Sequence, residues 1–144
     1  MSKRLVTGIA MAVSLLASGV DPARCTLFVQ STVSEHTELA WIFNTVTPLG
    51  ELERQTQYKD KVVRQESVLA GLLNYPVLQA ADVALYQSDL VPVGEDQVQH
   101  LELAREIVRR WNAKFGVEFF VEPRPFLTQT RRIMGLDGRA KMSK

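Results

Sequence analysis

A short apolar segment, residues 90–93, leads through Gly94 directly into the most regular amphipathic stretch of the sequence, residues 96–112. In this second stretch apolar side chains recur every three or four residues, which predicts a surface helix with one buried face. The first segment predicts a strand, and because Pro92 lacks an N–H donor, that strand lies at a sheet edge or ends near the proline. A strand followed by a covering helix is the unit from which parallel sheets are built.

The rest of the chain continues this alternation of strands and helices. Apolar runs predict two further short strands, at residues 25–30 and 119–121. The other predicted elements are a helix at residues 35–46, a frayed helix and mobile loop at 50–65, a helix at 67–74 that ends ahead of Tyr75-Pro76, and an apolar segment at 77–86. We therefore expect an α/β, Rossmann-like fold in which helices cover a parallel sheet and ligands bind beyond the carboxyl ends of its strands.

The first twenty residues admit two interpretations. Lys3 and Arg4 precede an apolar run at residues 5–16, and small residues follow it, which is the layout of a secretory signal. The apolar residues also recur at helical spacing, with Gly19 placed to end a helix in a left-handed conformation. The amphipathic helix is the preferred interpretation, and an exported protein that loses this segment is the alternative.

Composition excludes several classes of protein. With 144 residues, 46% of them hydrophobic and 23% charged, the chain is typical of one soluble globular domain. A net charge of +1 gives no overall field that would attract nucleic acid. Cys25 is the single cysteine and cannot form an intramolecular disulfide, and with only two histidines beside it a structural zinc site is not expected.

The turn after residues 90–93 carries groups suited to a polar ligand. Gly94 has no side chain, so a ligand can approach the backbone there. Glu95 and Asp96 would repel phosphate oxygens, which favours a ribose hydroxyl or an ammonium group, and Gln97 can both donate and accept beside them. The alternative is that the two carboxylates only complement the helix dipole.

Asp82 lies on an apolar segment, with Gln79 one helical turn before it on the same face. A carboxylate there either turns to solvent or meets a specific donor. His36 and His100 lie on predicted helices without a carboxylate or serine at the spacing of a catalytic triad, so both are interpreted as surface or packing residues. From residue 121 onward the chain has six basic and two acidic side chains, which predicts a local anion site or, alternatively, a solvated tail.

Four motifs occur together, at residues 56–61, 75–82, 91–100 and 141–144. Their order and spacing resemble the tryptophanyl-tRNA synthetases, a family of class I aminoacyl-tRNA synthetases, from about Leu15 to the last residue. The tetrapeptide Lys-Met-Ser-Lys at the end is a weak signal alone, but together with the Gly-Glu-Asp-Gln turn it is specific. The sister family that activates tyrosine differs after the corresponding strand.

The resemblance implies a role for each matching residue. Asp82 would accept the indole N–H, in a pocket lined by Gln79, where many members of the family have Met, and by Val91 and Val93. Tyr75 and Gln97 would face the ammonium group of tryptophan. The residues implied at ATP are Gly94, Asp96, Gln97, Lys141, Met142, Ser143 and Lys144, and those implied in catalysis are Lys61, Lys141, Ser143 and Lys144.

The resemblance also implies the reaction and its partners. A tryptophan–tRNA ligase activates L-tryptophan with ATP to tryptophanyl-adenylate and transfers it to tRNA(Trp). Mg²⁺ would arrive with the triphosphate, with no metal held by the protein. We expect a homodimer, no association with membranes, and a place in the cytoplasm or in an organellar matrix.

Parts of the family pattern have no counterpart in the sequence. These are an N-terminal strand with the first ATP motif, the serine that closes the C-terminal signature, and a helical anticodon domain. Residues 1–144 are therefore expected to form a partial catalytic domain with no second domain, and to be a poor catalyst alone. The alternative is a non-catalytic module that binds tryptophan, ATP or RNA.

Overall fold

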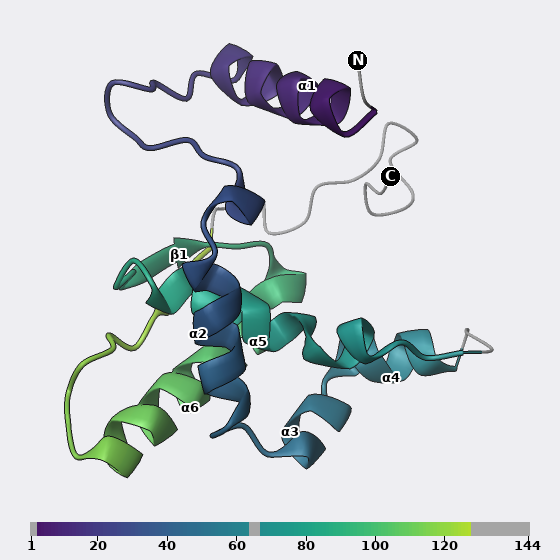
Figure 1. Ribbon diagram of the computed structural model, residues 1–144, viewed down its shortest axis with the longest axis vertical. Coiled ribbons are helices and arrows are strands. Elements are labelled where there is room, and N and C mark those ends of the chain that lie inside the picture. The colour runs from purple at the N-terminus through teal and green to yellow at the C-terminus, as the bar shows by residue number, and fades with distance from the viewer. Residues whose placement is uncertain (1–2, 64–66, 128–144) are drawn as a thin grey trace. The chain divides into compact units, whose positions relative to one another are not determined.

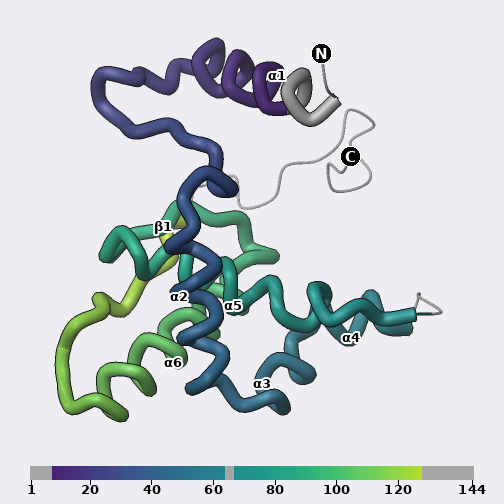
Figure 2. Tube along the Cα trace, viewed as in Figure 1, coloured from purple at the N-terminus to yellow at the C-terminus, as the bar shows by residue number. Residues whose placement is uncertain are grey.

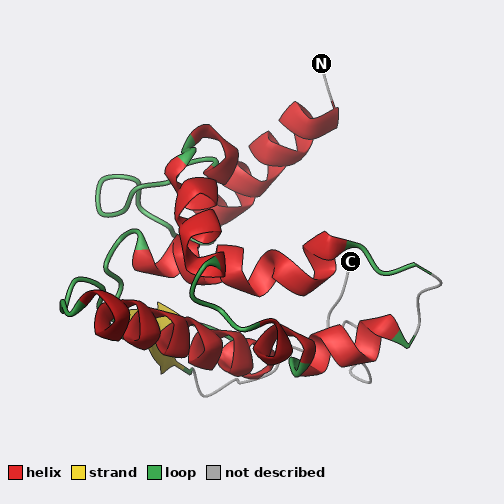
Figure 3. Ribbon diagram, turned by 60° about the horizontal axis from the view of Figure 1, so that its bottom comes forward, coloured by secondary structure: helices red, strands yellow, loops and turns green. Residues whose placement is uncertain are grey.

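The computed structural model describes residues 3–63 and 67–127, with only the backbone of residues 3–7. The chain divides into two compact units, Met1–Ser34 and Glu35–Lys144. Helices predominate in both units (Figure 3). No helix among the described residues combines the length and apolar character needed to cross a bilayer.

The first unit is built on helix α1, Lys3–Ala17, which confirms the helical interpretation of this segment (Figure 1). Gly19 follows with a φ of 95°, the left-handed conformation predicted for it. The strand predicted at residues 25–30 is wrong: this segment is irregular and runs into a short 3₁₀ helix, η1, Gln30–Thr32. An apolar run becomes a strand only where another strand pairs with its backbone, and no described strand does so here.

The second unit consists of helices arranged around α5, Ala70–Ala84, which packs against both α2, Glu35–Asn44, and α6, Val98–Phe115 (Figure 1). Two short helices, α3, Leu49–Glu53, and α4, Thr56–Val62, connect α2 to the segment before α5, as the trace in Figure 2 shows. Their common core contains several large side chains that are at most 1% exposed: Phe43, Val77, Leu101, Ile107 and Val108.

Helix α5 runs through Pro76, so the prediction that a helix ends ahead of this residue is wrong. A proline inside a helix removes one backbone hydrogen bond and costs about 3 kcal/mol. Pro76 is fully buried, as is its neighbour Val77. The helix is therefore continuous because burial of its apolar face outweighs the local preference of proline, a balance that sequence spacing does not reveal.

The sheet is small and parallel. Strand β1, Leu90–Pro92, pairs with β2, Arg124–Phe126, in a register that sets Val91 opposite Pro125. This confirms the predicted strand, with Pro92 as its last residue, and the parallel sheet covered by helices. The short 3₁₀ helix η2, Glu95–Gln97, connects β1 to α6.

The strand predicted at residues 119–121 is wrong, because a side chain takes the place of a partner strand. The Asn112 side chain accepts hydrogen bonds from the backbone N–H groups of Phe119 and Phe120 at 3.3 and 3.1 Å. Its amide nitrogen also donates to the carbonyl oxygen of Phe120 at 2.8 Å. The Phe120 ring packs edge-on against Phe43, 5.2 Å between centroids, so the apolar run is held by α6 and the core.

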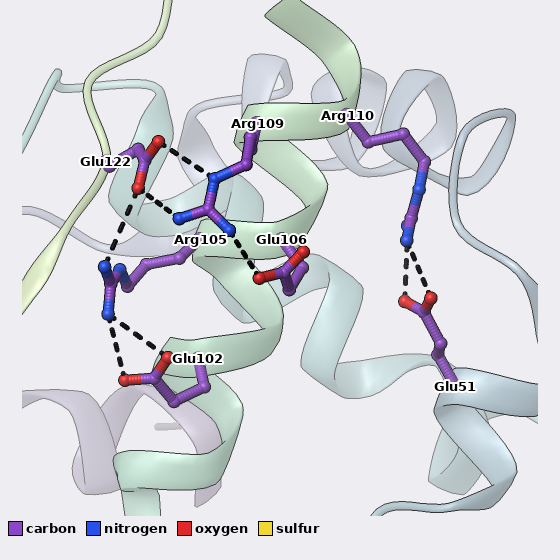
Figure 4. A network of polar contacts seen from close by, with 7 residues as sticks. All are labelled: Glu51, Glu102, Arg105, Glu106, Arg109, Arg110 and Glu122. Atoms are coloured by element: carbon purple, nitrogen blue, oxygen red, sulfur yellow. Dashed lines mark hydrogen bonds and ion pairs between the residues drawn. The ribbon is translucent and has the colours of Figure 1, made fainter. Parts of the chain in front are cut away.

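Ion pairs connect α6 to its neighbours (Figure 4). The carboxylate of Glu122 contacts both Arg105 and Arg109, and its hydrogen bond with Arg109 lowers the pKa of Glu122. Arg110 donates two hydrogen bonds to Glu51, at 2.7 and 3.2 Å, and both side chains are partly buried. This second pair fastens α3 to α6 and thereby fixes where α4 begins.

The Glu51→Gln variant is expected to unfold with a free energy about 1 kcal/mol lower than that of the original chain, because a charged, partly buried pair becomes a neutral one. Urea titration measures the change. Asp89→Asn is the matched control: Asp89 pairs with Arg124 at 3.8 Å with both side chains about 70% exposed, and the expected loss is below about 0.5 kcal/mol. Equal losses in the two variants would contradict the role given to the pair between α3 and α6.

Candidate functional site

The end of β1 carries five of the predicted site residues: Val91, Val93, Gly94, Asp96 and Gln97. The strand is followed by Val93, whose backbone N–H donates to Phe126 at 3.2 Å, and then by Gly94. Gly94 has φ −74° and ψ 161°, an extended conformation open to any residue, so what distinguishes this position is the missing side chain. Val91 and Val93 are half-buried and pack against the core. The carboxyl end of β1 is thus the edge at which a parallel α/β sheet binds its ligands.

The turn after Gly94 is tied to α4. Gln97 donates from its side-chain amide to a carboxylate oxygen of Asp96 at 3.0 Å. The backbone carbonyl of Asp96 accepts from the Gln57 amide at 3.2 Å, and the backbone N–H of Thr56 donates to the Gln99 side chain at 3.0 Å. The structure therefore brings α4, which carries the predicted residue Lys61, to the turn that carries Asp96 and Gln97.

Tyr75 connects this arrangement to α5 and α6. Its hydroxyl donates to Gln57 Oε1 at 3.0 Å and lies 2.9 Å from His100 Nε2. Because the single hydroxyl hydrogen is used on Gln57, Nε2 of His100 is the donor in the second contact. The ammonium group of Lys61 lies 5.4 Å from the centre of the Tyr75 ring, within cation–π range. Burial raises the pKa of Tyr75, so its hydroxyl keeps its hydrogen at neutral pH.

His100 is 1% exposed, which confirms the packing interpretation and excludes the surface one. Burial lowers its pKa below the ordinary 6.5; the positive charge of Lys61 lowers it further, and Asp96 opposes the shift. The imidazole is therefore neutral at pH 7. Its contact with Tyr75 was not predicted, since the two residues are 25 positions apart in the sequence and no local signal indicates the pairing.

A second polar group, which we call the His36 cluster, consists of His36, Asp82 and Tyr86. His36 Nδ1 lies 2.7 Å from Asp82 Oδ1, and His36 Nε2 lies 3.0 Å from the Tyr86 hydroxyl. The sequence analysis interprets His36 as a surface or packing residue; the structure buries it, and its contact with Asp82 was not predicted. The two partners are 46 residues apart and meet only because α2 packs on α5.

Tyr75, Gln79 and Asp82 are half-buried and follow one another at spacings of four and three residues on α5. These spacings put them on a common face of the helix. The predicted residues Lys141, Met142, Ser143 and Lys144 lie outside the described residues. Within the described part of the chain, no cluster of His, Cys, Asp or Glu could hold a metal ion.

Hollows open at the surface among the described residues of the second unit. A hollow of about 310 Å³ between α2 and α5 has Trp41, Tyr75 and Leu78 among its lining residues. A larger one of about 680 Å³, lined by residues that include Arg109 and Glu122, contains none of the predicted site residues. We assign the site to the polar groups at the β1 edge, because convergent polar side chains mark a binding site better than volume does.

Comparison with known proteins identifies relatives of the chain. The family described as tRNA synthetases class I (W and Y) matches residues 1–144. The tryptophan–tRNA ligase of Deinococcus radiodurans is 58% identical over 93% of this chain and 41% of its own length. That of Parasynechococcus marenigrum is 57% identical over 90% of this chain and 40% of its own length. The chain thus spans about two fifths of the relatives it matches.

A solved structure shows the same fold. The tryptophanyl-tRNA synthetase of Campylobacter jejuni, crystallised with ADP and tryptophan, superposes with a TM-score of 0.82 at 44% identity. The match covers 93% of this chain and 42% of that protein. The parallel sheet and its covering helices are therefore those of a Rossmann-like domain.

Tyr75→Phe is expected to loosen α4, because it removes the hydroxyl that joins Gln57 to His100. We expect amide hydrogen exchange in residues 56–62 to become about 5- to 30-fold faster, the effect of losing 1–2 kcal/mol. Tyr58→Phe is the matched control, since it removes a hydroxyl of α4 that bonds to no described residue. Unchanged exchange in Tyr75→Phe would show that α4 is held by other contacts.

The lowered pKa of His100 predicts a loss of stability in acid. The unfolded chain takes up a proton at pH 6.5, before the folded protein does, so the contribution of His100 is complete above this pH and declines as the pH falls through the folded value. Urea titrations at pH 7.5 and 5.5 measure the loss. The loss of stability between pH 7.5 and 5.5 should be smaller in Lys61→Gln, which removes one cause of the lowered pKa of His100, and smaller still in His100→Gln. Equal losses in the original chain and in both variants would refute the contribution of His100 to the loss in acid.

Proposed function

The chain belongs to the class I tRNA synthetases for tryptophan and tyrosine, and from this we propose that it contributes the amino-acid and nucleotide contacts of tryptophan–tRNA ligation. The observation that carries the proposal is the common face of Tyr75, Gln79 and Asp82 on α5. It presents a carboxylate, 34% exposed, from an otherwise apolar helix. A carboxylate only accepts hydrogen bonds, and the indole N–H of tryptophan only donates.

We assign the amino-acid contacts to α5 and β1. Asp82 accepts the indole N–H, and Gln79, Val91 and Val93 line the sides of the ring pocket. Tyr75 and Gln97 face the ammonium group. The two valines are half-buried at the edge of the core, so they can contact a ring and still belong to the folded structure.

The nucleotide contacts belong to the turn and to the charged segments beside it. Gly94 and Asp96 receive the ribose of ATP together with Gln97, and Lys61 reaches the triphosphate. Lys141, Met142, Ser143 and Lys144 form the signature loop that stabilises the departing pyrophosphate. Support comes from α4, whose hydrogen bonds to the backbone of Asp96 and to Gln99 set Lys61 near the turn.

The chemistry is nucleophilic displacement at phosphorus followed by acyl transfer. A carboxylate oxygen of L-tryptophan attacks the α-phosphate of ATP and pyrophosphate departs, which leaves tryptophanyl-adenylate. A ribose hydroxyl at the acceptor end of tRNA(Trp) then attacks the carbonyl carbon and AMP departs. The protein positions the reactants and stabilises the charge that develops, while Mg²⁺ accompanies the triphosphate.

We further propose a homodimer that works in the cytoplasm or an organellar matrix. The dimer is supported by large apolar side chains that remain exposed on the second unit. Trp41 on α2 is 72% exposed and Leu49 at the start of α3 is 59% exposed. Exposed apolar groups of this size mark surfaces for association.

The test compares tryptophan with 3-benzothienylalanine, in which sulfur replaces the indole N–H. Isothermal titration should show that the chain binds tryptophan more tightly, by a factor of about 10 to 150, since a hydrogen bond to a charged group contributes about 1.5–3 kcal/mol. Asp82→Ala should abolish this preference. The control Asp89→Ala removes an exposed carboxylate beside β1 and should keep it. Equal affinities for both compounds in the original chain would overturn the proposal.

A further inference from the structure

His36 lies behind Asp82. It belongs to the first turn of α2, and its side chain is 3% exposed, whereas that of Asp82 on α5 is 34% exposed. The contact of 2.7 Å therefore runs from the core outward to a carboxylate at the surface. From its buried position, His36 can act on a ligand through Asp82.

The hydrogens in this contact are fixed by the chemistry of the partners. A carboxylate only accepts, so Nδ1 of His36 carries the hydrogen that lies between it and Oδ1 of Asp82. On the other side of the ring, Nε2 faces the hydroxyl of Tyr86 at 3.0 Å, and a hydroxyl can donate as well as accept. Both ring nitrogens thus have partners, and the imidazole is held from two directions.

Tyr86 can reach the ring because of how α5 ends. The helix stops at Ala84, and Gln87 then adopts a left-handed conformation with a φ of 54°. The chain turns there, and the Tyr86 ring packs at 5.5 Å from that of His36. Helix α5 and the turn that follows it therefore supply the carboxylate and the hydroxyl that hold the histidine of α2.

We propose that His36 is a positioning residue for amino-acid selection: it fixes the carboxylate of Asp82 in the orientation that accepts the indole N–H. This inference rests on the function proposed above. An aspartate at a surface samples several rotamers, and a donor fixed in the core selects among them before a ligand arrives. A carboxylate can accept about four hydrogen bonds, so the bond from His36 does not use up its capacity.

Two amide variants separate positioning from packing. The side-chain nitrogen of asparagine can take nearly the place of Nδ1 and donate to Asp82, whereas that of glutamine lies one methylene further, near Nε2. We expect His36→Gln to lower the preference for tryptophan over 3-benzothienylalanine about tenfold, the effect of one hydrogen bond. His36→Asn should keep most of the preference. Isothermal titration of both compounds into each variant measures it.

A core variant gives the reference for a purely structural effect. Ile107→Val removes one methyl group from a fully buried side chain of the core and lowers stability. This variant should leave the preference for tryptophan over 3-benzothienylalanine unchanged. If Asp82→Ala abolishes the preference for tryptophan, the proposed function stands. The inference about His36 is then overturned by either of two results: His36→Gln leaves this preference unchanged, or His36→Gln and His36→Asn reduce it equally. If the original chain shows no preference, the proposed function fails and this inference fails with it.

Discussion

Polar side chains on a helix that packs into a core must find hydrogen-bond partners, and this requirement organises the second unit. Leaving such a group without a partner costs about 1–3 kcal/mol. Helix α5 carries two of them on its functional face. The Tyr75 hydroxyl meets Gln57 of α4 and His100 of α6, and the Asp82 carboxylate meets His36 of α2. Three helices are thus placed around α5 by specific hydrogen bonds as well as by apolar contact.

The charge of the site follows from the same contacts. Lys61 lies against the ring of Tyr75, and the imidazole of His100 lies beneath the hydroxyl of that ring. A protonated His100 would add a second positive charge close to Lys61, and both burial and that charge lower the pKa of the histidine. Lys61 therefore lies next to a neutral imidazole, which adds no second positive charge beside its ammonium group.

Local sequence signals predicted much of the fold. The strand, turn and helix at residues 90–112 depend on short-range periodicity and on Gly94, and the structure contains all three. The failures have non-local causes. The runs at residues 25–30 and 119–121 have the composition of strands, but no strand among the described residues pairs with them. Pro76 is tolerated inside α5 because the surrounding core buries it.

The candidate site, like the fold, was predicted from local signals and missed where contacts are non-local. Motif order pointed to Tyr75 and Asp82, which the helical period sets on one face of α5. No spacing in the sequence pointed to His36 or His100, since each meets its partner only when separate helices pack together. A buried histidine found with a half-exposed acid is the signal that only the structure supplies.

In the proposed function, selection of the amino acid and handling of the nucleotide depend on different helix contacts. The orientation of Asp82 depends on how α2 packs against α5, whereas the position of Lys61 depends on how α4 is tied to the turn after β1. The effects of substitutions on the free energy of unfolding add when the residues share no partner. A substitution in the contact between α2 and α5 should therefore leave the contact between α4 and the turn nearly unaffected. Tyr75 is the exception, because it lies on α5 with Asp82 and bonds to α4 through Gln57. One route for coupling between the two proposed substrate sites therefore passes through its hydroxyl.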